Sequence, residues 1–391
     1  MNMPAIIQQD FTGGNSVRLI RGGKAYFDLL LQLVSEARQT IHLQAYIISD
    51  DDTGKMVAEA LVQAARRKVA VFVLADGYAS QSLGDDYTAQ LREAGVHFRF
   101  FEPFLKSRYF YFGRRLHQKI FVADAAVALV GGINIGNRYN DLPGAPAWLD
   151  FALLVRGPVA QQLCHKCQRA WNGWVLTRQK QPSCENDAAA TAGLVPVRVR
   201  SNDWVRHRNE ISGTYIQMLR SAQRQVTIFC SYFLPGRFMR RLLKAAAKRG
   251  VQVRVVTAGP SDVRIAKNAE RWMYDWLLRH NIAVYEYEAS VLHAKIALCD
   301  TAWLTVGSYN INDISAYASI ELNLDVADPV FTASVQQELD DIILKQCSPV
   351  TAAAHQRHKN IFKQFVRWVS YEAVRLIFYS VTFYYRQHRN R

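Results

Sequence analysis

The chain has 391 residues, with 48 lysines and arginines against 33 aspartates and glutamates, which gives a net charge of +15. This length suggests two domains, and the charge favours an anionic partner, either nucleic acid or anionic lipid. No run of about 18 uncharged apolar residues is visible, nor a cationic N-terminal segment followed by an apolar one. The sequence therefore argues against a conventional transmembrane helix and against a secretory signal peptide.

The first predicted elements are helices and strands in alternation. Residues 36–48 read as a helix end followed by an apolar strand, and residues 54–77 as an amphipathic helix followed by a β-branched strand. The same two patterns return at 221–234 and 236–259. We therefore expect an α/β protein of two similar halves, each a mixed sheet flanked by helices, packed about a pseudo-two-fold axis around one shared active site.

Residues 101–115 combine six aromatic side chains with four lysines and arginines. Such a segment suits a membrane interface. It would also suit stacking on unpaired bases, and a third interpretation is a buried loop that packs on the core. Its position just before the motif described next makes it a candidate part of a substrate-binding surface.

A motif of the form His-x-Lys-x4-Asp-x6-Gly-(Gly/Ser)-x-Asn occurs twice with identical spacing. The first copy consists of His117, Lys119, Asp124, Gly131, Gly132 and Asn134, and the second of His293, Lys295, Asp300, Gly307, Ser308 and Asn310. Apolar, β-favouring residues follow each histidine and predict a strand. Because side chains alternate along a strand, the histidine and the lysine of each copy share one face.

The residue types of this motif suit chemistry on a phosphodiester. A lysine beside a histidine favours phosphate binding and disfavours a protonated ring, so the histidine stays neutral and nucleophilic. The glycines allow a tight turn or close approach to a ligand, and asparagine or serine donors can stabilise charge that develops at phosphorus. The alternative, a core histidine with a solvated lysine, is harder to sustain for two copies with one spacing.

Six cysteines are scattered along the chain, which suits a reducing compartment. Cys164 and Cys167 form a C-x-x-C in a helical stretch, but no second C-x-x-C accompanies them, so we expect no metal site. Residues 177–196 are small and polar with prolines towards both ends, and predict a mobile linker. The predicted domains are therefore residues 1–176, 197–350 and a C-terminal segment at 351–391.

The C-terminal segment 361–391 is rich in aromatic and β-branched residues and poor in acids. Lys363, Arg367 and Ser370 fall on one helical face, so the segment predicts a basic amphipathic helix that lies in a membrane surface. Its uncharged core at 376–385 is too short to span a bilayer. The other interpretation is a helix docked on the protein itself.

The paired motifs identify the chain as similar to the phospholipase D superfamily, whose members carry two such HKD motifs. The resemblance covers roughly residues 15–345. Within the superfamily the chain looks most like bacterial cardiolipin synthases of the short type, which lack an N-terminal pair of membrane spans. Residues 74–80 and 231–236 add weaker support.

The resemblance implies a mechanism that needs no metal or cofactor. One motif histidine attacks phosphorus and forms a phosphohistidine, and the other protonates the leaving alcohol and then activates the incoming one. By resemblance we assign His117 as the nucleophile and His293 as the general acid and base, although the two roles could be exchanged. Asp124 and Asp300 take a supporting, structural role.

The resemblance also implies residues that bind the phosphate and residues that orient the histidines. The positions that match the phosphate-binding set are Lys119, Lys295, Asn134, Asn310 and Ser308. A downstream carboxylate normally orients each histidine through its other ring nitrogen. We expect Asp150 to serve His117 and Glu321 to serve His293.

The function implied is a phosphatidyltransferase that joins two phosphatidylglycerol molecules into cardiolipin and releases glycerol. Alternatives are phospholipase D hydrolysis, a nuclease and an inactive lipid-binding protein. The apolar C-terminal segment makes nucleic acid an unlikely partner, and two intact motifs argue against an inactive protein. We expect a peripheral protein bound to anionic phospholipid on the cytoplasmic face of the inner membrane, and the sequence does not predict its oligomeric state.

Overall fold

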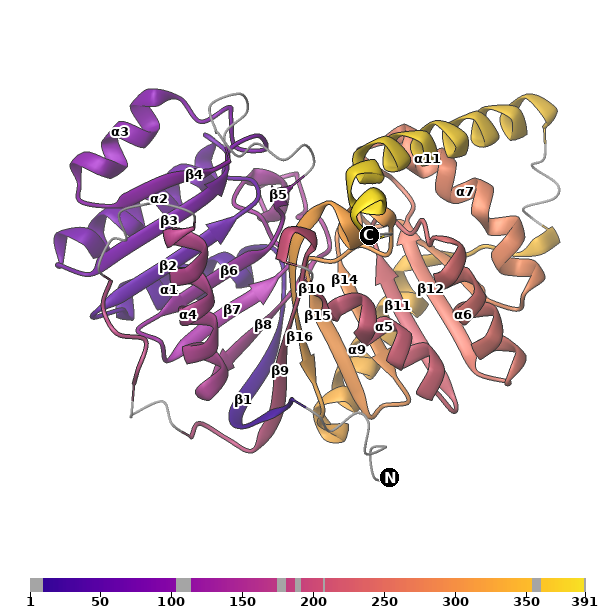
Figure 1. Cartoon of the computed structure of the whole chain (residues 1–391), viewed down its shortest axis with the longest axis horizontal. Helices are drawn as coiled ribbons and strands as arrows, with labels where there is room; N and C mark the ends of the chain where they lie inside the picture. Colours follow the sequence, from indigo (N-terminus) through magenta and orange to yellow (C-terminus); the bar gives the residue numbers. More distant parts are fainter. Residues whose placement is uncertain are drawn as a thin grey trace.

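The structure is a computed structural model that describes residues 10–102, 114–173, 181–186, 191–206, 208–353 and 360–389. Two similar α/β halves lie side by side, the first in indigo to magenta and the second in salmon to orange (Figure 1). The predicted fold class is confirmed. Much of the aromatic and basic segment at 101–115 lies outside the described residues.

The first half consists of β1 (Thr12–Arg21), α1 (Lys24–Glu36), β2 (Thr40–Ala45), α2 (Asp52–Arg66), β3 (Ala70–Asp76), α3 (Asp85–Glu93), β4 (His97–Phe101), β5 (Arg115–Leu116), β6 (Lys119–Ala123), β7 (Val127–Gly131), a 3-10 turn (Asn137–Tyr139), β8 (Phe151–Arg156) and α4 (Pro158–Asn172). Its strands lie in the order β4-β3-β2-β6-β7-β8-β1. The pairs β2–β3 and β3–β4 are parallel and the others antiparallel, so the sheet is mixed.

The second half repeats this order. It consists of β9 (Val195–Asp203), a 3-10 turn (Trp204–Arg206), β10 (Arg208–Asn209), α5 (Glu210–Ser221), β11 (Gln225–Cys230), α6 (Arg237–Lys248), β12 (Gln252–Ala258), α7 (Arg264–Arg279), β13 (Ala283–Tyr287), β14 (Lys295–Cys299), β15 (Trp303–Gly307), α8 (Asp313–Tyr317), β16 (Ser319–Val326), α9 (Pro329–Gln346), β17 (Cys347–Pro349) and α11 (Ile361–Arg389). The sheet runs β17-β13-β12-β11-β14-β15-β16-β9.

Two strand pairings join the halves. β1 pairs with β8 in its own half and with β9 in the other, and the short β5 pairs in parallel with β16. One apolar cluster also draws on both sheets, with Leu153 and Val130 from the first half beside Ile296 and Leu324 from the second. Because backbone hydrogen bonds and buried apolar side chains both cross this junction, the relative position of the halves is fixed.

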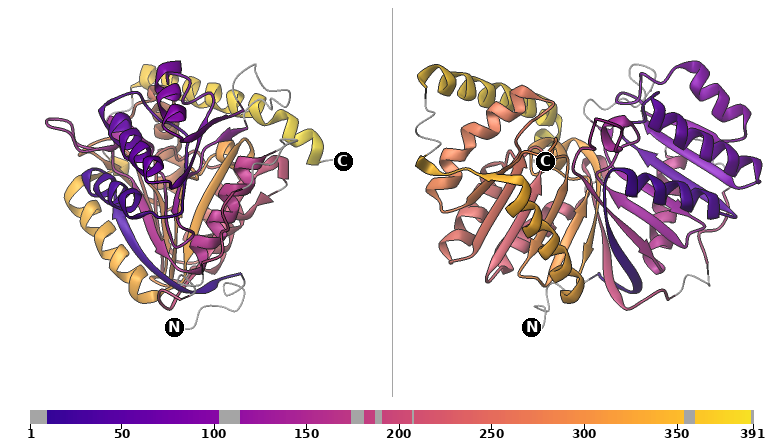
Figure 2. Two further views of the ribbon diagram at one scale, coloured as in Figure 1. Left: turned by 90° about the vertical axis from the view of Figure 1, so that its left-hand side faces the viewer. Right: turned by 180° about the vertical axis from the view of Figure 1, so that it is seen from behind.

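Helices cover both faces of each sheet. In the second half α5 and α6 lie in front of the sheet in Figure 1, and α9 lies on the opposite face, which is turned towards the viewer in the right-hand view of Figure 2. The front helices pack on the sheet through buried residues such as Met218 and Leu243, and α9 through Leu339 and Ile342. The result is a three-layer arrangement in each half, with helices on both faces of the sheet.

The predicted linker is fastened to the first half where the structure describes it. Cys184 forms a disulfide with Cys164 of α4, and Gln168 Nε2 donates a hydrogen bond of 2.7 Å to the carbonyl of Pro182. The mobile linker expected from the sequence is therefore wrong for residues 181–186, and the expectation of reduced cysteines is wrong for this pair. The cause is a buried thiol brought against α4 from 20 residues away.

Helix α11 lies along α7 at the top of the second half in Figure 1. Its Val374 is buried against Leu234, Ala269 and Met273, so one face of the helix is docked on the protein. In the described part of the chain, no helix combines the length and apolar content needed to cross a bilayer.

Candidate active site

The two motif histidines meet at the junction because each is hydrogen-bonded to the backbone of the opposite half. The amide of His117, just before β6, donates to the carbonyl of Ile320 at 3.0 Å. The amide of His293, just before β14, donates to the carbonyl of Leu149 at 2.8 Å. The residue that follows each of these carbonyls is a buried acid, so the backbone pairing brings a carboxylate to each ring.

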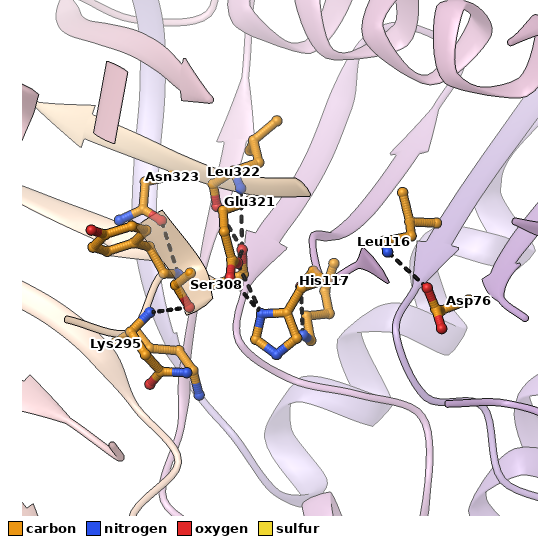
Figure 3. Close-up of polar contacts among 12 residues, drawn as sticks. Asp76, Leu116, His117, Lys295, Ser308, Glu321, Leu322 and Asn323 are labelled. Carbon is orange, nitrogen blue, oxygen red and sulfur yellow. Dashed lines mark hydrogen bonds and ion pairs between the residues drawn. The ribbon is translucent and has the colours of Figure 1, made fainter. Parts of the chain in front are cut away.

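His117 is held by Glu321 of β16 (Figure 3). Its Nδ1 lies 2.8 Å from Glu321 Oε2 and 3.0 Å from Oε1. Glu321 is fully buried, and the Ser308 hydroxyl donates to its Oε2 at 2.5 Å. A carboxylate at Nδ1 keeps the proton on that nitrogen, so the lone pair lies on Nε2.

His293 is held in the same way by Asp150. Its Nδ1 lies 2.6 Å from Asp150 Oδ2, while the amide of Phe151 donates to Asp150 Oδ1 at 2.8 Å. The predicted pairing of acids and histidines is therefore wrong, because each acid serves the histidine of the other half. The sequence repeat aligned each acid with its own motif, whereas the strands that carry the acids face across the junction.

The motif lysines lie beside their histidines. Lys119 Nζ donates to the carbonyl of His117 at 2.5 Å and lies 5.1 Å from the centre of the Tyr46 ring. Lys295 Nζ donates to the carbonyl of His293 and lies 3.0 Å from its Nδ1. Both lysine side chains are buried beside their histidines.

Burial sets the protonation of this cluster. It lowers the pKa of His117, with Glu321 opposing the effect and Lys119 adding to it. Burial and then Lys295 lower the pKa of His293 well below its ordinary value. Burial also lowers the pKa of Lys119 to about 7 and raises that of Asp150 to about 7. Near neutral pH both imidazoles are therefore neutral, the form that a nucleophile requires.

The predicted phosphate-binding side chains differ in their availability. Asn134 is engaged at both ends, since its Oδ1 accepts from the amide of Ile47 and its Nδ2 donates to the Tyr139 hydroxyl. Asn310 Oδ1 accepts from the Ser231 hydroxyl at 2.8 Å, which orients its amide. Ser308 donates to Glu321, so its hydroxyl positions a carboxylate rather than facing a phosphate.

Gly132 stands where the second motif has Ser308, and the neighbouring acid explains the difference. A Cβ at Gly132 would lie 2.5 Å from Asp150 Oδ2, so no side chain fits there. The shorter acid, Asp150, approaches the backbone of its motif directly. The longer acid, Glu321, leaves room for a serine hydroxyl.

The two motif aspartates lie outside the catalytic cluster. Asp124 follows β6, and its carboxylate accepts from the amides of Arg38, Gln39 and Thr40 at 2.8 Å each. Asp300 follows β14 and accepts from the amides of Gln223, Arg224 and Gln225 at 2.7–2.8 Å. Each aspartate thus fixes the entry to β2 or β11 at the opposite end of the strand from the histidine, which agrees with the supporting role predicted for it.

Sequence reasoning missed the aromatic residues that enclose the rings. Tyr46 packs edge-on against His117 with ring centres 4.8 Å apart, and Tyr139 does the same against His293 at 5.2 Å. Trp148 lies 6.0 Å from His293. Tyr139 and Trp148 come from the segment between the first motif and β8 that has no counterpart in the second half. The extra length of this segment was the sequence signal that could have pointed to Tyr139 and Trp148.

Asp76 is a further missed residue. It is fully buried at the end of β3, and its carboxylate accepts from the amide of Leu116 at 2.8 Å (Figure 3). Asp76 thereby holds β5, the short strand that pairs with β16 and brings His117 to Glu321. An acid at the end of an otherwise apolar strand was the signal. Within the described residues no cluster of three or more histidines, cysteines or acids is arranged to hold a metal ion.

A family model described as cardiolipin synthase, PLD-like domain, matches residues 30–145 and 215–343, one match in each half. The chain belongs to this family. Cardiolipin synthase B of Salmonella typhi is 35% identical over 351 residues, covering 86% of this chain and 82% of that protein. Cardiolipin synthase A of Pseudomonas putida (strain GB-1) is 31% identical, covering 90% of this chain and 73% of that protein.

Solved structures share the fold of these relatives at lower sequence identity. The phosphatidylserine synthase of Haemophilus influenzae Rd KW20 superposes with a TM-score of 0.75 at 14% identity, covering 96% of this chain and 97% of that one. The likeness extends over both halves and confirms the predicted two-half phospholipase D fold.

Proposed function

We propose that the protein is a cardiolipin synthase that transfers a phosphatidyl group from one phosphatidylglycerol to another. The observation that carries the proposal is the pair of neutral histidines, each held at Nδ1 by a buried carboxylate of the other half. Both Nε2 atoms are thereby left with a lone pair at one junction, beside two lysines. A nucleophile, an acid–base partner and anion-binding cations are the three elements that phosphodiester exchange requires.

In the first step, His117 Nε2 attacks phosphorus and forms an N–P bond while the P–O bond to glycerol breaks. His293 gives its Nε2 proton to the departing glycerol oxygen. The arriving phosphodiester is an anion, and its charge raises the pKa of the histidines, so the proton is taken up with the substrate. The product of this step is a phosphatidyl-histidine and free glycerol.

In the second step, His293 accepts the proton of a glycerol hydroxyl from a second phosphatidylglycerol. The oxygen attacks phosphorus, the N–P bond breaks, and cardiolipin leaves. Lys119, Lys295 and the Asn310 amide would neutralise charge on the non-bridging oxygens. The same geometry serves the reverse assignment, in which Glu321 supports a protonated His117, and mapping the phosphorylated peptide separates the two.

The deciding experiment is product analysis by mass spectrometry after incubation with phosphatidylglycerol liposomes. Cardiolipin that disappears in His117→Ala and in His293→Ala is the expected result. Phosphatidic acid alone would identify a hydrolase in which water outcompetes the alcohol. No lipid turnover would overturn the proposal, and single-stranded DNA would become the next substrate to test.

We further propose that α11 attaches the protein to anionic membranes. Opposite its docked face, α11 presents Phe362, Phe365 and Leu376, whose exposed fractions are 72%, 57% and 65%. Their spacing places them on one face of the helix, and Lys363 and Arg375 lie to either side. An exposed apolar stripe on a strongly basic protein suits the surface of a bilayer rich in acidic lipid.

The side of the membrane is a separate matter. The Cys164–Cys184 disulfide is typical of oxidising compartments, whereas the sequence led us to expect the cytoplasmic face. We retain the cytoplasmic face as the proposal, which requires that Cys164 and Cys184 are reduced in the cell. Cells quenched with a thiol-alkylating reagent before lysis test it, because free Cys164 and Cys184 should then be recovered alkylated.

A further inference from the structure

A large cavity lies in the second half between α6, α8 and α11, away from the two histidines. Its volume is about 1200 Å³, larger than the roughly 300–1,000 Å³ of a typical ligand pocket. The walls are mostly apolar and include Leu234, Met239, Ile311, Ala316, Val374 and Phe378. None of the motif histidines or lysines lines the cavity, so the proposed reaction does not explain why the cavity is present.

One wall of the cavity is the back of the catalytic loop. Tyr309, Ile311 and Asn312 line the cavity, whereas Ser308 donates to Glu321 and Asn310 accepts from Ser231. Residues of the segment 308–312 therefore contact the candidate active site on one side and line the cavity on the other. The Leu234 amide donates to the carbonyl of Ile311 at 3.1 Å, which ties a second cavity wall to this segment.

Three arginines line the cavity, and the Nε of one of them, Arg240, is buried without a partner among the described residues. Arg237, Arg240 and Arg375 line it, together with the acids Asp313 and Glu372. Arg375 pairs with Glu372 at 3.1 Å. Arg240 lies 5.9 Å from the centre of the Trp276 ring, and its buried Nε has no hydrogen-bond partner in the part of the chain that the structure describes. A buried guanidinium donor without an acceptor points to an anionic ligand.

Helix α11 connects the cavity to the membrane. Its docked face lines the cavity through Val374 and Phe378. Leu376 also lines the cavity with a side chain that is 65% exposed, whereas Phe362 and Phe365 are exposed outside the lining. A lipid acyl chain that leaves the bilayer beside α11 would therefore reach the cavity by moving past this one helix. This continuity, with the arginines of the lining, identifies the occupant as a lipid with an anionic head group.

We propose that this cavity binds an anionic phospholipid at a second, non-catalytic site, with the acyl chains among the apolar walls and the phosphate on Arg240. The proposal rests on the membrane role of α11 proposed above. A lipid held there would fix the wall that carries Ser308 and Asn310 on its other side. Occupancy by membrane lipid would thereby stabilise the catalytic loop.

The test uses the full chain carrying His117→Ala, which cannot turn lipid over, and dioctanoyl phosphatidic acid below its critical micelle concentration as the probe. Isothermal titration calorimetry should show saturable binding. Arg240→Gln should weaken it about tenfold or more, because charged hydrogen bonds are strong. Arg241→Gln, exposed on the same helix and outside the cavity lining, is the matched control and should bind normally.

Two further arms separate the cavity from the catalytic site. Dioctanoylglycerol, which lacks the phosphate, should bind the Arg240→Gln and Arg241→Gln chains equally. Ala373→Trp should place an indole ring in the cavity and weaken the binding of both probes, with circular dichroism confirming the fold. Binding that is lost in Lys295→Met but unchanged in Arg240→Gln and Ala373→Trp would overturn the proposal, as would no saturable binding. Because no arm measures turnover, failure here is distinct from failure to make cardiolipin.

Discussion

His117 Nδ1 lies 2.8 Å from Glu321 Oε2, although 204 residues separate them in the chain. The mirror relationship joins His293 to Asp150 across 143 residues. Each motif histidine therefore depends on both halves, because the ring comes from one half and the carboxylate that holds its Nδ1 comes from the other.

Glu321→Gln should lower kcat about a thousandfold, since an amide at Nδ1 no longer fixes the tautomer that leaves Nε2 as the nucleophile. Phosphohistidine trapping with peptide mapping checks which ring is affected. With the assignment proposed here, the variant should lose the phosphopeptide that contains His117. Glu59→Gln, exposed on α2, is the control, and normal trapping in Glu321→Gln would remove the orienting role of Glu321.

Ser308→Ala should lower kcat about tenfold and leave KM unchanged. Its hydroxyl donates to Glu321 at 2.5 Å, and a hydrogen bond to a charged group contributes about 1.5–3 kcal/mol. Steady-state kinetics on mixed micelles make the measurement, with Ser334→Ala on α9 as the control. A rise in KM at constant kcat would instead return Ser308 to the phosphate-binding set.

Asp124→Asn and Asp300→Asn should each destabilise the fold by about 1–3 kcal/mol while leaving kcat near normal at 25 °C. Each carboxylate accepts three backbone amides, and an uncharged amide in its place weakens three hydrogen bonds to a charged group at the start of β2 or β11. Urea denaturation measures the free energy of unfolding. A large loss of kcat in a stably folded Asp124→Asn would show that the aspartate acts in the chemistry.

Asp150→Asn should raise Tm at pH 8.5 but not at pH 4, while activity falls. Burial raises the pKa of Asp150 from 3.8 to about 7, so between these values the folded chain binds a proton that the unfolded chain does not. Stability from this group is therefore present below pH 4 and is lost as pH rises through 7. Differential scanning calorimetry across this range checks it, with the exposed Asp341→Asn as the control. Equal Tm differences at both pH values would contradict the buried-charge explanation.

Replacing Phe362, Phe365 and Leu376 together with serine should weaken binding to phosphatidylglycerol liposomes at least tenfold without a loss of Tm. These side chains are exposed, so the protein loses no packing, whereas a bilayer would lose three apolar anchors. Liposome co-sedimentation makes the measurement. Leu344→Ser, 80% exposed on α9, is the control for the loss of an exposed leucine elsewhere. Unchanged sedimentation of the triple variant would show that α11 is not the anchor.

The sequence predicted the elements whose signals are local. The repeated spacing of the His–Lys motif gave both site strands, because strand periodicity and apolar composition act within a few residues. The pairing of Asp150 and Glu321 was wrong because it depends on which strands meet across the junction, and the pattern of one strand does not encode its partner. Cys184 was missed for the same reason, since only folding brings it to α4. The supporting role of Asp124 and Asp300 stays a prediction, and their backbone amide partners were not foreseen.

The contrast between Gly132 and Ser308 bears on how such a protein changes over time. The Asp150 carboxylate occupies the space that a side chain at position 132 would need, whereas the Glu321 carboxylate accepts a hydrogen bond from the Ser308 hydroxyl. The size of each acid therefore fits the residue beside it. Lengthening Asp150 or adding a side chain at 132 alone would disturb the distant histidine. A substitution at Asp150 or Gly132 in the first half therefore acts on His293 of the second half.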